Sequence, residues 1–288
     1  MEDIPGKLLT QSDKVLGSGG FGEVRVGFYI GTPVAIKILH NTSDIRSKIE
    51  FDREVQNLKD LTHPNIVSIV AHDSRRIVME LYDSSLKQLN NSKDMCLVAR
   101  DCMRAISFMH LHNKECMRHR DIKPDNILVN LDQNGNIYKA SLGDVGLSTL
   151  CTNRNIGGTR GFTPFVKNSS DRMYDVVALG VSILDAIFEE HVHGGMDNYE
   201  TIEDYPRPGG SPYSRNNTMY YANNLLPVYL KPMSEMLVLS YMPGNSEDEK
   251  TTIVLNIQEQ WETLYDIERM KKKVSANPIK RLIRKIRK

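Results

Sequence analysis

The segment from Arg118 to Asn126 reads Arg-His-Arg-Asp-Ile-Lys-Pro-Asp-Asn and places an acid, a cation and an amide within six positions. Asp121 is suited to accept the proton of an attacking hydroxyl, Lys123 to neutralise a transferring phosphate, and Asn126 to bind a divalent metal. Few structural needs demand that combination. Because a short motif also arises by chance, the interpretation requires further motifs at fitting distances along the chain.

A glycine-rich segment lies upstream, near the N-terminus. Residues 17–22 follow the pattern Gly-x-Gly-x-x-Gly, with Leu16, Val24 and Val26 as apolar neighbours. A second strand-like segment follows, whereas the same pattern in a dinucleotide-binding unit leads into a helix. Glycines let backbone amides approach phosphate closely, so a hairpin of this kind can cover a triphosphate. An ordinary glycine-rich turn is the alternative interpretation.

Lys37 lies inside an apolar run, Val34 to Leu39, that is short enough to form a buried strand. A buried ammonium requires a charged partner. The next amphipathic stretch, Ile45 to Leu61, predicts a helix that carries Glu54 seventeen residues after Lys37. Two acids on this predicted helix, Glu54 and Glu50, are candidate partners, and a solvent-exposed lysine at a strand end is the alternative. The pattern places four apolar residues near one helical face: Ile49, Val55, Leu58 and Leu61.

From about Leu16 to Asp175, the order and spacing of these motifs resemble those of eukaryotic-type protein kinases. The resemblance implies that Lys37 contacts the α and β phosphates of ATP and that Glu54 holds Lys37. The Asp-Ile-Lys-Pro sequence that begins at Asp121 is more similar to serine/threonine kinases than to tyrosine kinases. Asp121 is then the residue that orients the acceptor hydroxyl, and Lys123 stabilises developing charge.

The resemblance also identifies residues that surround the nucleotide. Met79 would lie at the back of the adenine pocket, and backbone groups from Glu80 to Tyr82 would bond to the adenine edge, although a core methionine is the commoner role of any single Met. The full set implied to bind ATP is Leu16, Gly17, Ser18, Gly19, Gly20, Phe21, Gly22, Val24, Ala35, Lys37, Glu54, Met79 and Glu80.

A candidate metal-binding motif, Asp144-Val145-Gly146, follows Asn126 by eighteen positions. Mg²⁺ prefers hard oxygen donors and keeps several waters, so Asp144, Asn126 and the phosphates suffice to bind it. Mn²⁺ is a second candidate metal. Val145 replaces the phenylalanine usual in the family and removes an aromatic ring that packs under the helix carrying the pairing glutamate. We interpret this departure as a change in how the active arrangement is switched on and off, and not as a change in the phosphate-transfer reaction.

The segment after Asp144 resembles a kinase activation segment and ends differently. Phe165 stands where the family has a glutamate after Ala-Pro, and no convincing arginine partner occurs near Met242 to Asn245. Losing both ends of an ion pair can be nearly neutral, so the departure argues for a divergent kinase. Phosphorylated Thr149 or Thr152 is a hypothetical partner for Arg120. Asp175 is implied to brace the backbone of the catalytic loop.

Composition sets the remaining expectations. At 288 residues and 40% hydrophobic content, the length suits one catalytic domain. The four cysteines show no metal-ligand spacing, which favours reduced thiols in a cytoplasmic or nuclear protein. The acidic N-terminus lacks an apolar core and no run reaches the length of a membrane span, so we expect neither secretion nor a transmembrane anchor.

The C-terminal tail is strongly basic. Residues 271–288 contain nine Lys or Arg and no acid, and apolar residues from Ile279 to Ile286 recur at helical spacing. A basic strip that docks on the acidic body is one interpretation. An import-receptor or nucleic-acid contact and an anionic membrane surface are the others.

These observations predict an α+β fold: a bilobal protein kinase domain over residues 10–266, with an antiparallel N-lobe (about 10–80) that has one helix and a mainly α-helical C-lobe (about 81–266), then a basic tail (267–288). The expected activity is transfer of the γ-phosphate of ATP to hydroxyl groups of protein substrates, as a serine/threonine kinase. Two alternatives stay open: a pseudokinase that acts as a scaffold, and a small-molecule kinase with this fold.

Overall fold

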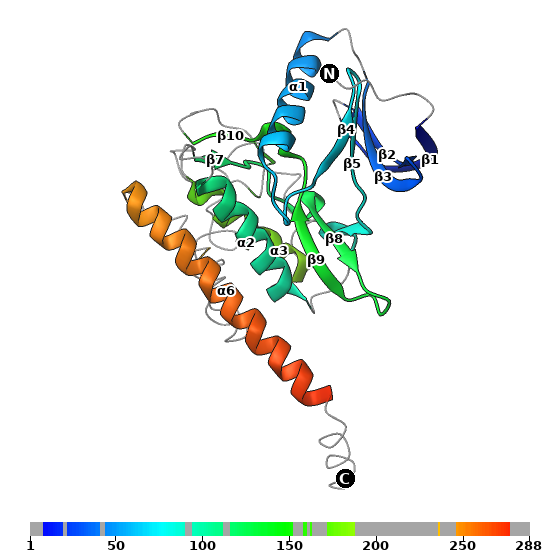
Figure 1. Cartoon of the computed structure of the whole chain (residues 1–288). Coiled ribbons are helices and arrows are strands. Elements are labelled where there is room, and N and C mark those ends of the chain that lie inside the picture. Colours follow the sequence, from blue (N-terminus) through cyan, green and yellow to red (C-terminus); the bar gives the residue numbers. More distant parts are fainter. Residues whose placement is uncertain are drawn as a thin grey trace, which may run out of the picture.

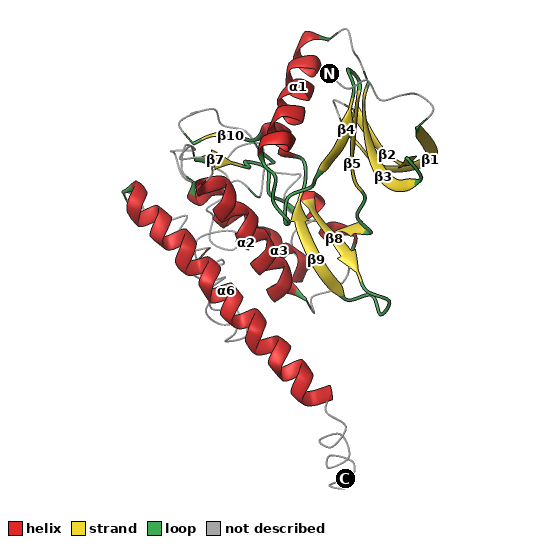
Figure 2. Cartoon of the chain, in the orientation of Figure 1, coloured by secondary structure: helices red, strands yellow, loops and turns green. Residues whose placement is uncertain are grey.

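A computed structural model describes residues 8–19, 22–40, 44–89, 94–111, 116–151, 158–159, 162, 172–187, 236 and 246–276. Figure 1 shows a sheet-rich lobe at the top and a lobe that holds most of the helices below it. Figure 2 separates the same two parts by secondary structure. The predicted α+β, two-lobed architecture is confirmed.

The N-lobe is a five-stranded antiparallel sheet in the order β1-β2-β3-β5-β4. Its strands are β1 (Leu9–Ser18), β2 (Gly22–Tyr29), β3 (Thr32–Leu39), β4 (Ile69–His72) and β5 (Arg76–Glu80). Gly17 pairs with Val24 across β1 and β2. The glycine-rich segment therefore closes a hairpin, as its strand-like flanks predicted.

One helix, α1 (Ile45–Asp60), covers this sheet in the described part of the N-lobe. Phe51, Val55 and Leu58 form its buried stripe at positions i, i+4 and i+7. The prediction for Ile49 is wrong, because its side chain is 53% exposed. It lies two residues, about 200°, around the helix from Phe51.

The C-lobe is built around three described helices: α2 (Met95–Leu111), α3 (Met173–Ile187) and α6 (Glu247–Ala276). Val176, Leu179 and Ile183 of α3 are fully buried, so this helix lies inside the lobe. In α2, Leu97, Ala105, Ile106 and Met109 are buried and Phe108 is partly buried.

Short elements under the N-lobe carry the catalytic segment. They are β6 (Ser84–Ser85), η1 (Leu86–Gln88), β7 (Met117–Arg118), η3 (Pro124–Asn126), β8 (Ile127–Leu131), β9 (Ile137–Leu142), η4 (Val145–Leu147) and β10 (Thr149–Leu150). Strands β6, β8 and β9 form one sheet, and β7 pairs with β10 in another. The turns between these strands place η3 and η4 at the lobe boundary.

Helix α6 packs along α2 (Figure 1). Trp261 is fully buried, and its Nε1 donates to Met236 Sδ. Helix α6 also crosses the predicted domain limit at residue 266. Most of the predicted basic tail, from residue 277, lies outside the described residues. Within the described part of the chain, no helix is both long enough and apolar enough to cross a membrane.

Two cysteines depart from the expected reduced state. Cys116 and Cys151 form a disulfide, whereas Cys96 and Cys102 are buried and take no part in it. The antiparallel pairing of β7 with β10 brings the first two together although they are 35 residues apart in sequence. The prediction of four reduced thiols is therefore wrong for this pair. The spacing of the two cysteines along the chain gave no indication that they pair.

Candidate active site

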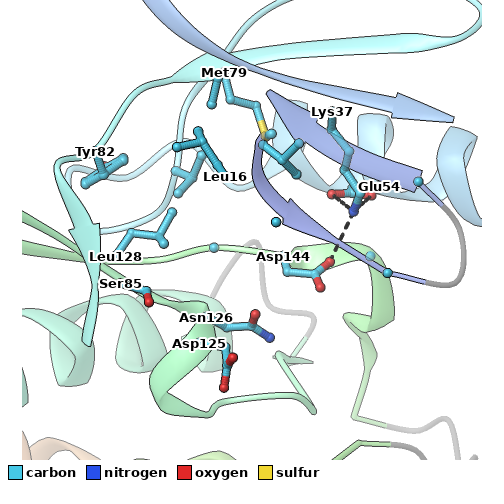
Figure 3. A pocket seen from close by; sticks show the side chains of 18 of the residues that line it. Leu16, Lys37, Glu54, Met79, Tyr82, Ser85, Asp125, Asn126, Leu128 and Asp144 are labelled. Atoms are coloured by element: carbon cyan, nitrogen blue, oxygen red, sulfur yellow. Dashed lines mark hydrogen bonds and ion pairs between the residues drawn. The ribbon is translucent and has the colours of Figure 1, made fainter. Parts of the chain in front are cut away.

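A cavity of about 560 Å³ lies between the N-lobe sheet and the segments η3, β8 and η4 (Figure 3). That volume is typical of small-molecule sites. Leu16, Met79 and Leu128 line an apolar part, and Lys37 and Asp144 lie at a polar end. The cavity therefore offers an apolar slot that leads to charged groups.

The described part of the chain includes all but two of the predicted site residues, and all of these line this one cavity. They are Leu16, Gly17, Ser18, Gly19, Gly22, Val24, Ala35, Lys37, Glu54, Met79, Glu80, Asp121, Lys123, Asn126 and Asp144. Gly20 and Phe21 lie outside the described residues. Six segments that are separate in sequence thus supply one site, while the role of each side chain stays a prediction.

Lys37 on β3 is paired with Glu54 on α1. Lys37 Nζ lies 2.7 Å from Glu54 Oε1 and 2.5 Å from Oε2, and 3.4 Å from Asp144 Oδ1. Burial lowers the pKa of Lys37, but the two carboxylates outweigh it and the net pKa lies above its usual value. Lys37 therefore stays positively charged throughout the physiological range. The ion pair expected from the seventeen-residue spacing is present.

Asp144 begins the predicted metal-binding motif and faces Lys37 (Figure 3). Its side chain is 47% exposed, which leaves carboxylate surface open to the cavity. Burial raises the pKa of Asp144, but Lys37 and His119 lower it by a larger amount, so the net pKa lies below its usual value. The group is therefore ionised at neutral pH. Asp144 itself has a left-handed backbone with φ of 54°, a strained conformation for a residue with a side chain.

Asp175 on α3 fixes the backbone of the catalytic loop. Its Oδ2 accepts from the His119 backbone N at 2.8 Å, and its Oδ1 accepts from the Arg120 backbone N at 2.9 Å. Oδ2 also lies 3.0 Å from His110 Nε2. Arg120 has a φ of 74°, so these bonds hold a strained turn just before Asp121. The bracing role implied for Asp175 matches these contacts.

Asp121 lies in a dense polar cluster. Asn126 Nδ2 donates to the backbone O of Asp121 at 2.9 Å and to its Oδ2 at 3.1 Å, and Lys123 Nζ is 3.0 Å from Oδ2. Asn126 thus uses its amide nitrogen to hold Asp121, and its amide oxygen is the atom suited to a metal. The loop therefore fixes the carboxylate of Asp121 from two sides.

Thr159 completes this cluster, and the sequence did not reveal its position. Its hydroxyl donates to Asp121 Oδ1 at 2.7 Å and accepts from Lys123 Nζ at 2.7 Å. Its backbone N donates to the same Oδ1 at 2.9 Å. No local sequence pattern links Thr159 to Asp121, which lies 38 positions earlier in the chain.

The substituted motif residue Val145 is fully buried. Its backbone O accepts a hydrogen bond from Asn57 Nδ2 of α1 at 2.8 Å. Sequence reasoning also missed Asn57, although a polar amide beside the apolar stripe of a helix is a signal that could have been followed. Of the activation-segment residues, Thr152 and Phe165 lie outside the described part.

The two lobes, with this cavity between them, define a kinase-like domain. A family model described as the protein kinase domain matches residues 10–209, and the chain belongs to that family. The predicted limit at residue 266 extends past the match and stays a prediction.

Curated relatives agree in class. A leucine-rich repeat receptor-like serine/threonine-protein kinase of Arabidopsis thaliana is 30% identical over 197 residues, which cover 60% of this chain and 22% of that protein. A cysteine-rich receptor-like protein kinase of the same species is 30% identical over 207 residues, which cover 65% of this chain and 31% of that protein. The chain thus spans less than a third of the length of these relatives.

Proposed function

We propose that this protein kinase domain is catalytically active and transfers the γ-phosphate of ATP to serine or threonine hydroxyls of protein substrates. The observation that carries the proposal is the convergence of Lys37, Asp121, Lys123, Asn126 and Asp144 on one cavity. A scaffold without activity has no need of these five polar groups around one cavity.

The cavity fits Mg·ATP by the chemistry of its donors. The apolar slot beside Leu16 and Met79 suits a purine ring, and Lys37 offers a fixed positive charge to phosphates. Asp144 and Asn126 offer the hard oxygens that Mg²⁺ prefers, and Mn²⁺ accepts the same donors. When bound, the metal neutralises negative charge on the triphosphate.

The protein groups have separable tasks in this reaction. Asp121 orients the acceptor hydroxyl and accepts its proton as the oxygen bonds to the γ-phosphorus and ADP leaves. Lys123 balances the negative charge that develops, and Asn126 keeps Asp121 oriented through its Nδ2 contacts. The 2.7 Å contacts of the Thr159 hydroxyl with Asp121 and Lys123 support recognition of an aliphatic alcohol at this point.

A transfer assay with radiolabelled ATP and casein tests the proposal. We expect Mg²⁺-dependent labelling by the wild type and loss of labelling with Asp121→Asn, which keeps the shape of the side chain but removes the base. Lys87→Met is a matched surface control, because Lys87 forms only a half-exposed pair with Asp125. Labelling that persists in Asp121→Asn would contradict transfer by this site. Labelling that never occurs in the wild type would contradict an active kinase and favour the scaffold alternative.

A further inference from the structure

Asn57 connects α1 to the segment that follows Asp144. Its Nδ2 donates to Val145 O at 2.8 Å and to Ser148 O at 3.2 Å. The residue is 7% exposed, so water does not compete for these bonds. A buried amide with two backbone acceptors on a neighbouring segment is a defined anchor point.

The anchor lies on the face of α1 that already reaches the site. Residues three apart share a helical face, so Asn57 lies beside Glu54, which pairs with Lys37. Helix and motif approach closely there, because a Cβ added at Gly146 would lie 3.4 Å from Glu54 Oε2. One helical surface therefore touches both the phosphate-binding lysine and the metal-binding motif.

The motif itself lacks a strong local restraint. Asp144 has a left-handed backbone, and the only ion pair found for it among the described residues is the 3.4 Å contact with Lys37. Val145 contributes a small apolar side chain, which buries less apolar surface area than an aromatic ring does. Side-chain donors hold the backbone of this segment instead. Asn57 Nδ2 donates to Val145 O and Ser148 O, and Arg120 Nη1 donates to Leu147 O at 3.1 Å.

We propose that Asn57 is a positioning residue that holds Asp144 in its inward, metal-binding orientation and takes over part of the anchoring that an aromatic ring supplies in the usual motif. The catalytic part of this inference rests on the proposed kinase activity. The anchoring part does not, because it concerns the backbone from Val145 to Ser148.

Two variants of the full chain test the inference. Asn57→Asp keeps the shape of the side chain but removes both donated bonds, and Asn57→Leu removes them without adding charge. Gln56→Leu is the matched control, since Gln56 is exposed on the same helix and its amide bonds only to Asp60 in the described contacts. Amide hydrogen exchange of the peptide covering residues 144–150 is measured for each, together with the Mg²⁺ concentration that gives half-maximal transfer to casein.

We expect exchange in that peptide to rise at least about tenfold in both Asn57 variants, with exchange in β3 and α3 unchanged, which corresponds to loss of local anchoring without unfolding. The Mg²⁺ requirement should rise about tenfold while the KM for ATP changes less than about threefold, and Gln56→Leu should match the wild type. Unchanged exchange at residues 144–150 overturns the inference, as does raised exchange with an unchanged Mg²⁺ requirement. If the wild type transfers no phosphate, the proposed activity fails, and unchanged exchange in the variants would independently overturn the anchor.

Discussion

Lys37 Nζ and Glu54 Oε2 lie 2.5 Å apart and join β3 to α1 beside the cavity. The side chain of Glu54 is only 6% exposed and that of Lys37 is 22% exposed, so water screens the pair weakly. Breaking one end of such a pair leaves a buried charge without its partner. The position of α1 is therefore coupled to that of Lys37.

Glu54→Gln should lower kcat/KM on the order of 100-fold, equivalent to about 2.7 kcal/mol of lost transition-state stabilisation. Glu50→Gln is the matched control, since Glu50 lines the same cavity without a described bond to Lys37. Steady-state kinetics with ATP as the varied substrate measure both. An equal loss in the two variants would show that the cavity's general charge, and not the Lys37–Glu54 pair, matters.

The free energy of unfolding at acidic pH should depend on Asp175. Burial raises its pKa, but the contact with His110, the charge of His119 and the Arg120 amide outweigh that and hold it below the usual value. A carboxyl with a depressed folded pKa adds stability above its unfolded pKa of about 3.9 and loses it as the pH falls through the folded pKa.

We therefore expect Asp175→Asn to lose about 2–4 kcal/mol of unfolding free energy at pH 7, since it removes bonds to a charged group. This difference from the wild type should shrink as the pH falls below about 4, because the unfolded chain binds a proton at Asp175 before the folded chain does. Urea unfolding at several pH values measures it. A difference that stays constant down to pH 2 would contradict the assignment.

Thr159 should position Asp121 through its hydroxyl. Thr159→Val keeps the backbone bond to Asp121 but removes the side-chain bonds to Asp121 and Lys123. We expect kcat to fall about tenfold, because a mispositioned base loses part of its general-base contribution, with little change in the KM for ATP. Thr159→Ser restores the hydroxyl and should recover most of the rate. Equal rates for the two variants would rule this role out.

The Cys116–Cys151 disulfide should stabilise the oxidised protein. It closes a loop with a sequence separation of 35 residues, for which chain entropy predicts about 3–4 kcal/mol. Reductant should therefore lower the Tm of the wild type. In the double variant Cys116→Ser, Cys151→Ser, the same reductant should have no effect. A wild-type Tm that does not respond to reductant would argue against the bond.

Local sequence patterns were sufficient for the elements whose chemistry is written in consecutive residues. The hairpin after Gly17 and the strand around Lys37 follow from local patterns, and the kinase resemblance supplied the two lobes and the pairing of Lys37 with Glu54. The catalytic loop was recognisable because Asp121, Lys123 and Asn126 are close in sequence.

The remainder depends on contacts between distant segments. The β7–β10 pairing brings Cys116 to Cys151, and neither cysteine carries a local sign of its partner. Thr159 reaches Asp121 from 38 positions away, and Asn57 reaches Val145 from 88 positions away. Such contacts depend on how distant segments pack, which one-dimensional periodicity does not encode.

The most direct test of the account is calorimetric binding of a non-hydrolysable ATP analogue with and without Mg²⁺. The wild type should bind it more tightly in Mg²⁺ than in EDTA. In Asp144→Asn, the ratio of the affinity in Mg²⁺ to the affinity in EDTA should be at least about tenfold smaller, because the variant removes the charged carboxylate proposed to bind the metal. A wild-type chain without measurable affinity in magnesium buffer, or a variant with unchanged magnesium dependence, would contradict the site described for this kinase.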